Sequence, residues 1–568
     1  MISKGQISET RMLARMRITK RSLSYAFLFM SLASWILALA TSRFEFGANA
    51  GAIASLDGYY YIGVALLLIS FGLFVNSEAQ SDFPGLFILA MFVAELYFSP
   101  MLVRGFNPTQ DVAYEYGISS VITSQGGLQS VTSVLPNPLA WVLFGALNQV
   151  LELNTFQTAL PIYYFLLGPI DVVLFYSFVK QISENNRSLA SIATVLFVWS
   201  GWSVPYFLND VGLSFTLFLS LLLITSMHDS RKVTILMFVV TVVLVGTNVY
   251  GAFSCLGLLF MMSIFRSRFR FQLRTRYVFF FMASLFSLWN LVLAPLYLTS
   301  YAMNITQYFS SIFTLFTQFS SVTSASHYRV LSSRSYELIT ILFGAIAVAG
   351  FTKRIRRGLV PAPDGKILVS FLGILFGIVL IPVYGSVGGI LGAAINTLAR
   401  TWFFALFFVG FFGSTLFVAK RKMGLLLLVV FLVMTPLILL ATYGALGYNA
   451  EPPSVAQGGL FVQSNLPHGN ILESTNLTFN DNLFFTDGSQ YRFLTLGATY
   501  SFANHRLVGF GHLGYPVVVS LNQVDAGATY VLTGNSTTYS DIMLEFTTSV
   551  NLNLVYDSGT NSILVYFP

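Results

Sequence analysis

The stretch GYYYIGVALLLISFGLFVN, residues 58–76, contains no charged side chain and is apolar at most of its positions. As a helix, an apolar run of about 18 residues or more is long enough to cross the roughly 30 Å of hydrocarbon in a bilayer. Comparable runs recur through the first 446 residues, and 55% of the 568 residues are hydrophobic while 9% are charged. This composition excludes a soluble enzyme and predicts a polytopic α-helical membrane protein.

Thirteen apolar segments are predicted to span the membrane, and the basic residues orient them. If the N-terminus is cytoplasmic, the cytoplasmic segments hold 23 of the 30 Lys and Arg residues, including every lysine. Because cytoplasmic loops are enriched in Lys and Arg, this asymmetry predicts that orientation, and an odd number of spans then places the C-terminus outside. The net charge of +7 therefore reflects membrane orientation and does not indicate a nucleic-acid partner. The predicted spans are 23–41, 58–76, 84–101, 159–179, 189–208, 211–227, 233–250, 252–265, 277–297, 336–350, 367–384, 400–418 and 424–446.

The chain divides into three regions. Residues 1–22 form a basic cytoplasmic tail, and residues 23–446 form the transmembrane domain, with a large outer loop over 102–158. Within that loop, PLAWVLFGALNQVLE (138–152) is too short to span comfortably, so we expect an interfacial or partly inserted helix. Residues 447–568 contain no lysine and eight acidic residues. Alternating apolar runs separated by Gly, Asn and Asp turns predict a small extracytoplasmic β-rich domain there, with a hairpin at DSGTNS.

The outer loop carries the first candidates for chemistry, in FNPTQDVAYEYG, residues 106–117. Asp111 and Glu115 are four residues apart and share one face if this segment is helical. A carboxylate within hydrogen-bond reach of a hydroxyl can take its proton as a new bond forms, so both are candidate catalytic bases. The alternative is a solvated loop without a chemical role. Glu95 lies near the outer end of an apolar segment, where it could hydrogen-bond to this loop, and an ionisable group in such a segment suggests function.

The outer arginines are candidates for binding a phosphate. The planar guanidinium group can bind two phosphate oxygens at once, and a lipid phosphate at the outer headgroup level lies at the depth predicted for these residues. Anchoring of the helix ends at the interface is the alternative for any one of them. The tyrosines at 59–61 are interpreted as interfacial belt residues. The candidate arginines are Arg104, Arg329, Arg334 and Arg400.

The sequence offers no metal or redox motif. The five histidines lack the HExxH spacing of a metal site, and the lone cysteine, Cys255, cannot form an intrachain disulfide. Asp171, which follows Gly168-Pro169 in an apolar segment, is interpreted as a structural residue of the bundle. No cofactor is specified by the sequence.

Three stretches resemble archaeal multi-pass membrane proteins related to the GT-C glycosyltransferases. AIASLDGYYYIGVALLLISF (52–71) is similar to the second-helix entry of that group. DVAYE (111–115) resembles its D-x-x-Y-H stretch, and LVYDSGTNSILVY (554–566) resembles the hairpin that often closes such chains. The order of a large outer loop, an interfacial helix, further spans and an extracytoplasmic C-terminal domain also agrees.

The resemblance implies a GT-C-like fold and transfer of a sugar from a polyprenyl-phosphate carrier to an acceptor (glycan, lipid or protein) on the extracytoplasmic face. In such enzymes an acidic residue of the first large outer loop acts as the base, which points to Asp111. A lipid phosphate is a good leaving group, so one base and cationic stabilisation suffice, and a divalent metal is optional. Two departures matter: Glu115 stands where the group tends to have His, and the tandem acidic pair is replaced by D-x-x-x-E. With these two departures, the chain could have altered chemistry or could be an inactive relative of the group.

Two other function classes remain open. A non-enzymatic envelope protein would use residues 447–568 to bind a surface-layer or glycan partner, and it predicts an apolar or aromatic patch on that domain. A transporter should show polar groups meeting at the bilayer midplane between related halves, and no internal repeat is evident. The sequence does not identify the sugar, the acceptor, the carrier or the oligomeric state.

Overall fold

A computed structural model gives the fold. It describes residues 19–43, 55–77, 81–103, 119, 138–152, 156–201, 210–227, 230–269, 274–292, 327–358, 363–384, 390–418 and 421–443, and within the C-terminal region 470–472, 492–494, 500–501, 506–507, 517–522, 552–557 and 561–566. The helices are α2 (Lys20–Thr41), α3 (Gly58–Val75), α4 (Phe83–Val93), the π-helical turn η2 (Ala94–Phe98), α5 (Ser99–Val103), α8 (Leu139–Val150), α9 (Phe156–Ile182), α10 (Arg187–Ser200), α11 (Asp210–Ser226), α12 (Arg231–Thr247), α13 (Val249–Ile264), α14 (Arg266–Phe269), α15 (Thr275–Val292), α18 (His327–Arg356), α19 (Pro363–Tyr384), α20 (Ile390–Phe417) and α21 (Arg421–Tyr443).

Each segment predicted to span a membrane overlaps a helix in this structure. However, α10 ends at Ser200, within the predicted span 189–208, and α12 ends at Thr247, within the predicted span 233–250. Several helices are preceded by a polar residue whose side chain accepts a hydrogen bond from a backbone N–H of the first turn. Examples are Asp57 before α3, Asn186 before α10 and Ser230 before α12. In the described part of the chain, four helices are long and apolar enough to cross a membrane by length and composition: Lys20–Thr41, Gly58–Val75, Phe165–Ile182 and Glu337–Arg356.

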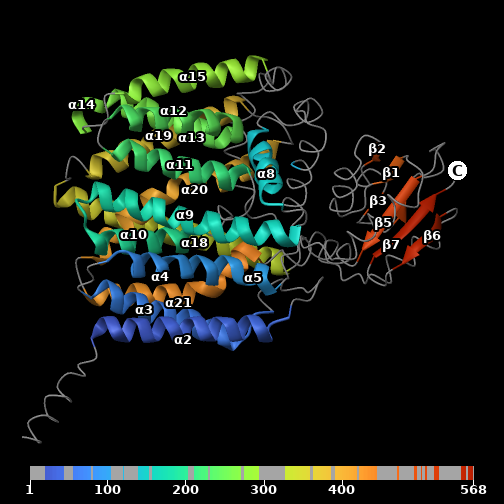
Figure 1. The fold of residues 1–568 in the computed structure, drawn as a ribbon, viewed down its shortest axis with the longest axis horizontal. Helices are drawn as coiled ribbons and strands as arrows, with labels where there is room; N and C mark the ends of the chain where they lie inside the picture. The colour runs from blue at the N-terminus through green and yellow to red at the C-terminus, as the bar shows by residue number, and fades with distance from the viewer. Residues whose placement is uncertain are drawn as a thin grey trace, which may run out of the picture.

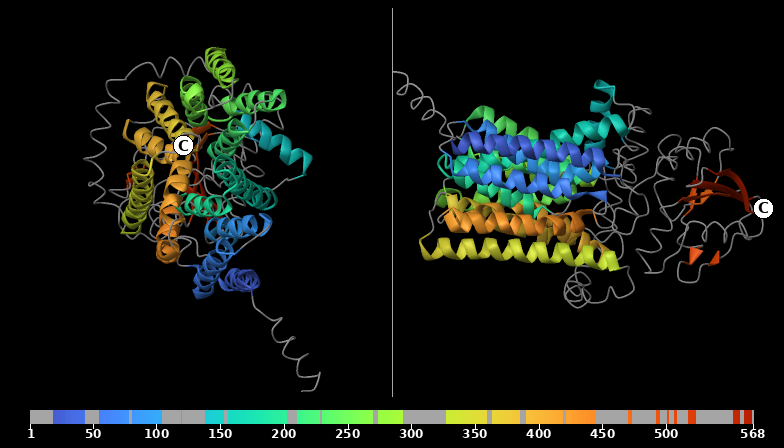
Figure 2. Two further views of the ribbon diagram at one scale, coloured as in Figure 1. Left: turned by 90° about the vertical axis from the view of Figure 1, so that its left-hand side faces the viewer. Right: turned by 90° about the horizontal axis from the view of Figure 1, so that it is seen from below.

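The long helices lie side by side in one bundle (Figure 1). Seen end-on, the bundle has α2 at one edge and α15 at another (Figure 2). Helix α2 packs along α3, α9 along α11, α13 along α19 and α18 along α20. Helix α8 is different, because it crosses the end of the bundle instead of running with it (Figure 1). This short helix is the one expected over 138–152.

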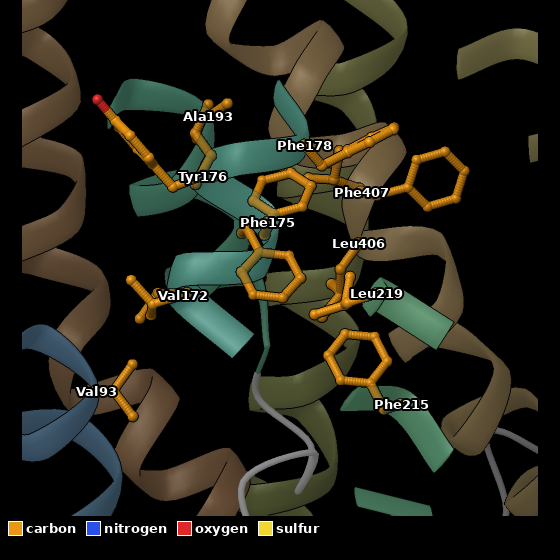
Figure 3. Close-up of a cluster of buried hydrophobic side chains, with 14 of the residues drawn as sticks. Val93, Val172, Phe175, Tyr176, Phe178, Ala193, Phe215, Leu219, Leu406 and Phe407 are labelled. Atoms are coloured by element: carbon orange, nitrogen blue, oxygen red, sulfur yellow. The ribbon is translucent and has the colours of Figure 1, made fainter. Parts of the chain in front are cut away.

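Aromatic rings fill the middle of the bundle, where α9, α10, α11 and α20 meet. Phe175 stacks on Phe197 with 4.3 Å between ring centroids, and Phe197 stacks on Phe215 at 5.8 Å. Phe404 meets Phe218 edge to face at 5.1 Å. Figure 3 shows Phe175 and Phe215 among the aliphatic side chains of neighbouring helices. Such ring pairs add about 0.5–1.5 kcal/mol each beyond area burial, which helps to hold helices whose surroundings are already apolar.

Glycines let two of these helix pairs approach closely. A Cβ added at Gly257 of α13 would clash with the carbonyl oxygen of Gly373 and lie 2.6 Å from the backbone nitrogen of Gly377, both on α19. A Cβ at Gly350 of α18 would similarly clash with the backbone of Phe412 on α20. Small residues at helix crossings allow backbone-to-backbone packing, which is a main source of helix association in lipid.

The C-terminal strands are β1 (Asn470–Leu472), β2 (Arg492–Leu494), β3 (Tyr500–Ser501), β4 (Arg506–Leu507), β5 (Val517–Asn522), β6 (Leu552–Asp557) and β7 (Asn561–Tyr566). Five of them pair in the order β2-β1-β5-β7-β6, and β3 pairs with β4. Strands β6 and β7, which flank the hairpin loop predicted at DSGTNS, are antiparallel neighbours. Figure 1 shows these strands beyond the end of the bundle at which α8 lies.

Candidate functional site

The predicted catalytic loop is bracketed by described helices. Helix α5 ends at Val103 and α8 begins at Leu139, and both lie at the same end of the bundle (Figure 1). Helix α8 is held there by Tyr163 of α9, whose hydroxyl donates to Asn148 Oδ1 at 2.7 Å. Three predicted site residues, Asp111, Glu115 and Arg104, fall outside the residues that the structure describes.

The other predicted arginines all lie in helices, which corrects the expected loop position of Arg329 and Arg334 and the expected position of Arg400 at the first residue of a span. Helix α18 begins at His327, so Arg329 and Arg334 are helical, and α20 begins at Ile390, so Arg400 is well inside a helix. Arg334 Nη1 donates to Glu337 Oε2 at 2.8 Å, one turn further along α18. This i,i+3 pair helps to extend the helix through a polar segment that a hydropathy window assigns to a loop. The side chains of Arg329 and Arg400 lie outside the described structure.

Glu95 is the predicted site residue whose surroundings are described in full. It lies in η2, the single π-helical turn between α4 and α5, and its side chain is buried at 1% exposure. Its Oε1 accepts a hydrogen bond of 2.7 Å from Ser31 on α2, whose hydroxyl also lies 2.9 Å from the carbonyl oxygen of Gly63 on α3. Glu95 is therefore at the junction of three helices. Its other oxygen, Oε2, is buried and has no hydrogen-bond partner in the described structure.

The π turn explains why this junction is polar. The Ser99 backbone N–H donates to Ala94 O, five residues back, so it bypasses the Glu95 carbonyl that an α-helix would use. That carbonyl accepts instead from Tyr60 at 2.9 Å and from Ser99 Oγ at 2.6 Å. Trp35 Nε1 in turn donates to Ser99 Oγ at 2.7 Å. A buried carbonyl needs a partner, and these side chains supply it.

The roles of these neighbours were not predicted from the sequence. Tyr60 was assigned to an interfacial belt, but it is 1% exposed and hydrogen-bonded inside the bundle, whereas Tyr59 is 47% exposed. The available signal was the spacing of Ser31 and Trp35, four residues apart on one face of α2. The cluster places a buried carboxyl group at the junction of three helices, with one hydrogen bond from Ser31.

Asp171 forms a second buried carboxyl site, as a structural residue of the bundle. It lies in α9 with no exposed surface, and its Oδ1 accepts from Thr216 Oγ1 of α11 at 2.7 Å. Its Oδ2 has no hydrogen-bond partner among the described residues. The contact joins the two helices, as polar side chains commonly do in membrane bundles.

An ionic cluster closes the opposite end of the bundle. Asp82, the N-cap of α4, contacts Lys180 of α9, and it accepts from Arg187 Nε of α10 at 2.9 Å and from the Tyr176 hydroxyl at 3.0 Å. Partial burial tends to raise the pKa of the Asp82 carboxyl, but the hydrogen bonds from Lys180 and Tyr176 and the charges of Lys180 and Arg187 hold it below its ordinary value. The cluster ties three helix ends together.

The described residues contain no group of three or more His, Cys, Asp or Glu side chains arranged to hold a metal ion. Nothing in that part of the chain therefore assigns a metal or cofactor to the junction around Glu95.

Comparisons with known proteins give structural neighbours. No protein-family model matches the sequence, and no curated protein is significantly similar to it. Among solved structures, the oligosaccharyltransferase of Archaeoglobus fulgidus aligns over 84% of this chain and 72% of its own, with 12% identity and a TM-score of 0.45. ArnT from Cupriavidus metallidurans, solved with undecaprenyl phosphate, aligns over 84% of this chain and 99% of its own, with 14% identity and a TM-score of 0.41.

Proposed function

We propose that this chain is a membrane glycosyltransferase that moves a sugar from a polyprenyl-phosphate carrier to an acceptor on the extracytoplasmic face. In this proposal the thirteen predicted spans cross the membrane, the N-terminus is cytoplasmic, and residues 447–568 form an extracytoplasmic β-rich domain. The outer loop 102–158 carries the active site.

One observation carries the proposal. Helix α5 ends and α8 begins at one end of the bundle, so the segment that contains Asp111 and Glu115 leaves and returns at that end, where α8 crosses the other helices (Figure 1). The C-terminal strands lie beyond the same end. This arrangement supports a site between the bundle, which can receive a lipid chain, and a region outside it, which can receive a polar acceptor.

The proposed step is a single displacement at the anomeric carbon of the sugar. Asp111 takes the proton of the acceptor hydroxyl or amide, the acceptor atom forms the new bond to the anomeric carbon, and the bond from that carbon to the lipid phosphate oxygen breaks. The bonding electrons leave with the phosphate, whose charge Arg104, Arg329, Arg334 and Arg400 are proposed to stabilise. Arg334 already pairs with Glu337, so phosphate binding there would compete with this carboxylate.

The test is transfer of labelled sugar from membrane polyprenyl-phosphate donors by the purified full chain. Wild type is compared with Asp111→Asn and Glu115→Gln, and with Glu152→Gln as an exposed carboxylate at the end of α8. Loss of one catalytic base is expected to slow transfer by about 10²–10⁴-fold in Asp111→Asn, while Glu152→Gln keeps wild-type transfer.

Two results would count against the proposal. Unchanged transfer in both Asp111→Asn and Glu115→Gln would remove these carboxylates as the base and direct the search to Glu95. Absence of transfer by wild type from every donor would favour the alternative, an envelope protein whose C-terminal domain binds a surface-layer or glycan partner.

A further inference from the structure

A cavity of about 310 Å³ opens at the end of the bundle opposite α8. It lies where α9, α18 and α20 end and α10 begins, so its walls come from four helix termini. Three cations line it, Lys353, Arg354 and Arg357, against a single carboxylate, Glu184. None of the residues that line it is assigned to the proposed reaction, so we treat this cavity as a separate feature.

The packing of α18 fixes two of the three cations. Lys353 Nζ donates to the carbonyl oxygens of Thr415 and Leu416, at 3.0 and 3.3 Å, at the last turn of α20. Arg354 uses Nε and Nη2 to reach one oxygen of the fully buried Asp364, at 3.1 and 2.9 Å, at the start of α19. These contacts leave the Nη1 group of Arg354 for another acceptor, and Arg354 retains 28% side-chain exposure.

Arg357 has a different environment from these two. It follows the last residue of α18, is exposed, and has no acidic partner among the described residues. Asp364 neutralises the charge of Arg354, and Glu184 neutralises a second positive charge. One of the three positive charges is left, so the cavity remains positive. A planar guanidinium at the mouth of a positive cavity is suited to a phosphate group.

The rest of the lining is mixed. Ser183, Asn186 and Thr415 are polar, whereas Ile182, Leu189, Phe411 and Val418 are apolar. A cavity at the ends of the helices that offers both cations and apolar side chains suits an amphiphile with an anionic head. Basic pockets between membrane helices on the cytoplasmic side are known to bind anionic headgroups.

We propose that this cavity binds the phosphate group of an anionic phospholipid, with Arg357 and Arg354 as its ligands. The site is independent of the proposed glycosyl transfer, because it uses none of the residues assigned to that reaction.

The experiment measures binding by the purified full chain in a neutral detergent, by native mass spectrometry and by the shift of the thermal unfolding midpoint. Two probes separate the sources of the phosphate: dimyristoyl phosphatidylglycerol and inorganic phosphate. Arg357→Gln is expected to weaken binding about fivefold, since one basic residue near an anionic surface contributes on the order of 1 kcal/mol. Arg356→Gln is the matched control, because it removes the same charge from an adjacent exposed residue that does not line the cavity.

A second variant is expected to gain affinity, so its result cannot be explained by misfolding. Glu184→Gln removes the opposing carboxylate and is expected to tighten binding of the same probe. Weakening in Arg357→Gln with no change in Arg356→Gln supports the site, and the probe that binds identifies the source. Equal weakening in both arginine variants, or binding that none of the variants alters, would overturn it.

Discussion

Ser31 Oγ lies 2.7 Å from Glu95 Oε1, and this hydrogen bond joins α2 to the π turn η2 across 64 residues of sequence. Because Glu95 Oε2 has no hydrogen-bond partner in the described structure, Ser31 is the residue that satisfies the carboxyl group. Ser31→Ala would leave both oxygens without a partner. We expect the variant to lower the free energy of unfolding by about 1 kcal/mol, measured by thermal or denaturant unfolding in detergent.

The pair can be isolated by a double-mutant cycle with Glu95→Leu, which removes the acceptor oxygens. If the two side chains interact as described, the double variant should be more stable than the sum of the two single changes predicts. Ser34→Ala is the control, because its hydroxyl donates from a half-buried position of α2 to Tyr59 O. Strict additivity in the cycle would contradict the interaction.

Tyr60→Phe tests the hydrogen bond that the π turn requires. The variant removes the donor to the Glu95 carbonyl and leaves the ring in place, so a loss of about 1 kcal/mol in the free energy of unfolding is expected. Tyr59→Phe changes a neighbouring, exposed tyrosine in the same way and should have little effect. Equal effects of the two substitutions would argue that Tyr60 acts only through packing.

The positions of the helices were largely predictable, because an apolar run reports the length of a membrane helix directly. The residues at which the helices begin and end were less predictable. The segment HYRVLSSRS before the apolar core of α18 is polar, and its helical state depends on contacts such as Arg334–Glu337 that a hydropathy window does not measure. For the same reason, the predicted span begins at Arg400, whereas α20 begins earlier, at Ile390.

The candidate site was less predictable for a different reason. The partners of Glu95 come from helices far apart in sequence, and a π turn has no local signature in the sequence, so Ser31 and Tyr60 were not connected with it. The assignments of Asp111, Glu115 and Arg104 remain predictions. They depend on a loop whose function is inferred from short stretches of resemblance.

Asp82 should give stability that depends on pH. The pKa of its carboxyl is lower in the folded protein than its ordinary value, so its contribution is complete above about pH 4, the unfolded value, and is lost as the pH falls through the folded pKa. Asp82→Asn is therefore expected to lower the free energy of unfolding at neutral pH by roughly 1 kcal/mol, as for a partly exposed cluster, and to have a smaller effect in acid.

The measurement is a series of unfolding midpoints from neutral pH downward for wild type and Asp82→Asn. Glu152→Gln, an exposed carboxylate near the other end of the bundle, is the control. A difference between wild type and Asp82→Asn that grows as the pH falls would have the wrong sign and would contradict the assigned shift.

Gly257 should be among the positions of the bundle least tolerant of added volume. The Cβ of alanine there would meet the carbonyl oxygen of Gly373 and lie 2.6 Å from Gly377 N, and these are backbone atoms that cannot rotate away. Helices α13 and α19 would have to separate, so we expect Gly257→Ala to lower the free energy of unfolding by about 1–3 kcal/mol. Gly344→Ala is the matched control, because a Cβ at Gly344 in α18 meets no atom within 4 Å. Alanine favours a helix by up to about 1 kcal/mol over glycine, so the control should be neutral or stabilising. Opposite signs for the two substitutions would assign the effect at Gly257 to the helix contact, and equal signs would refute that assignment.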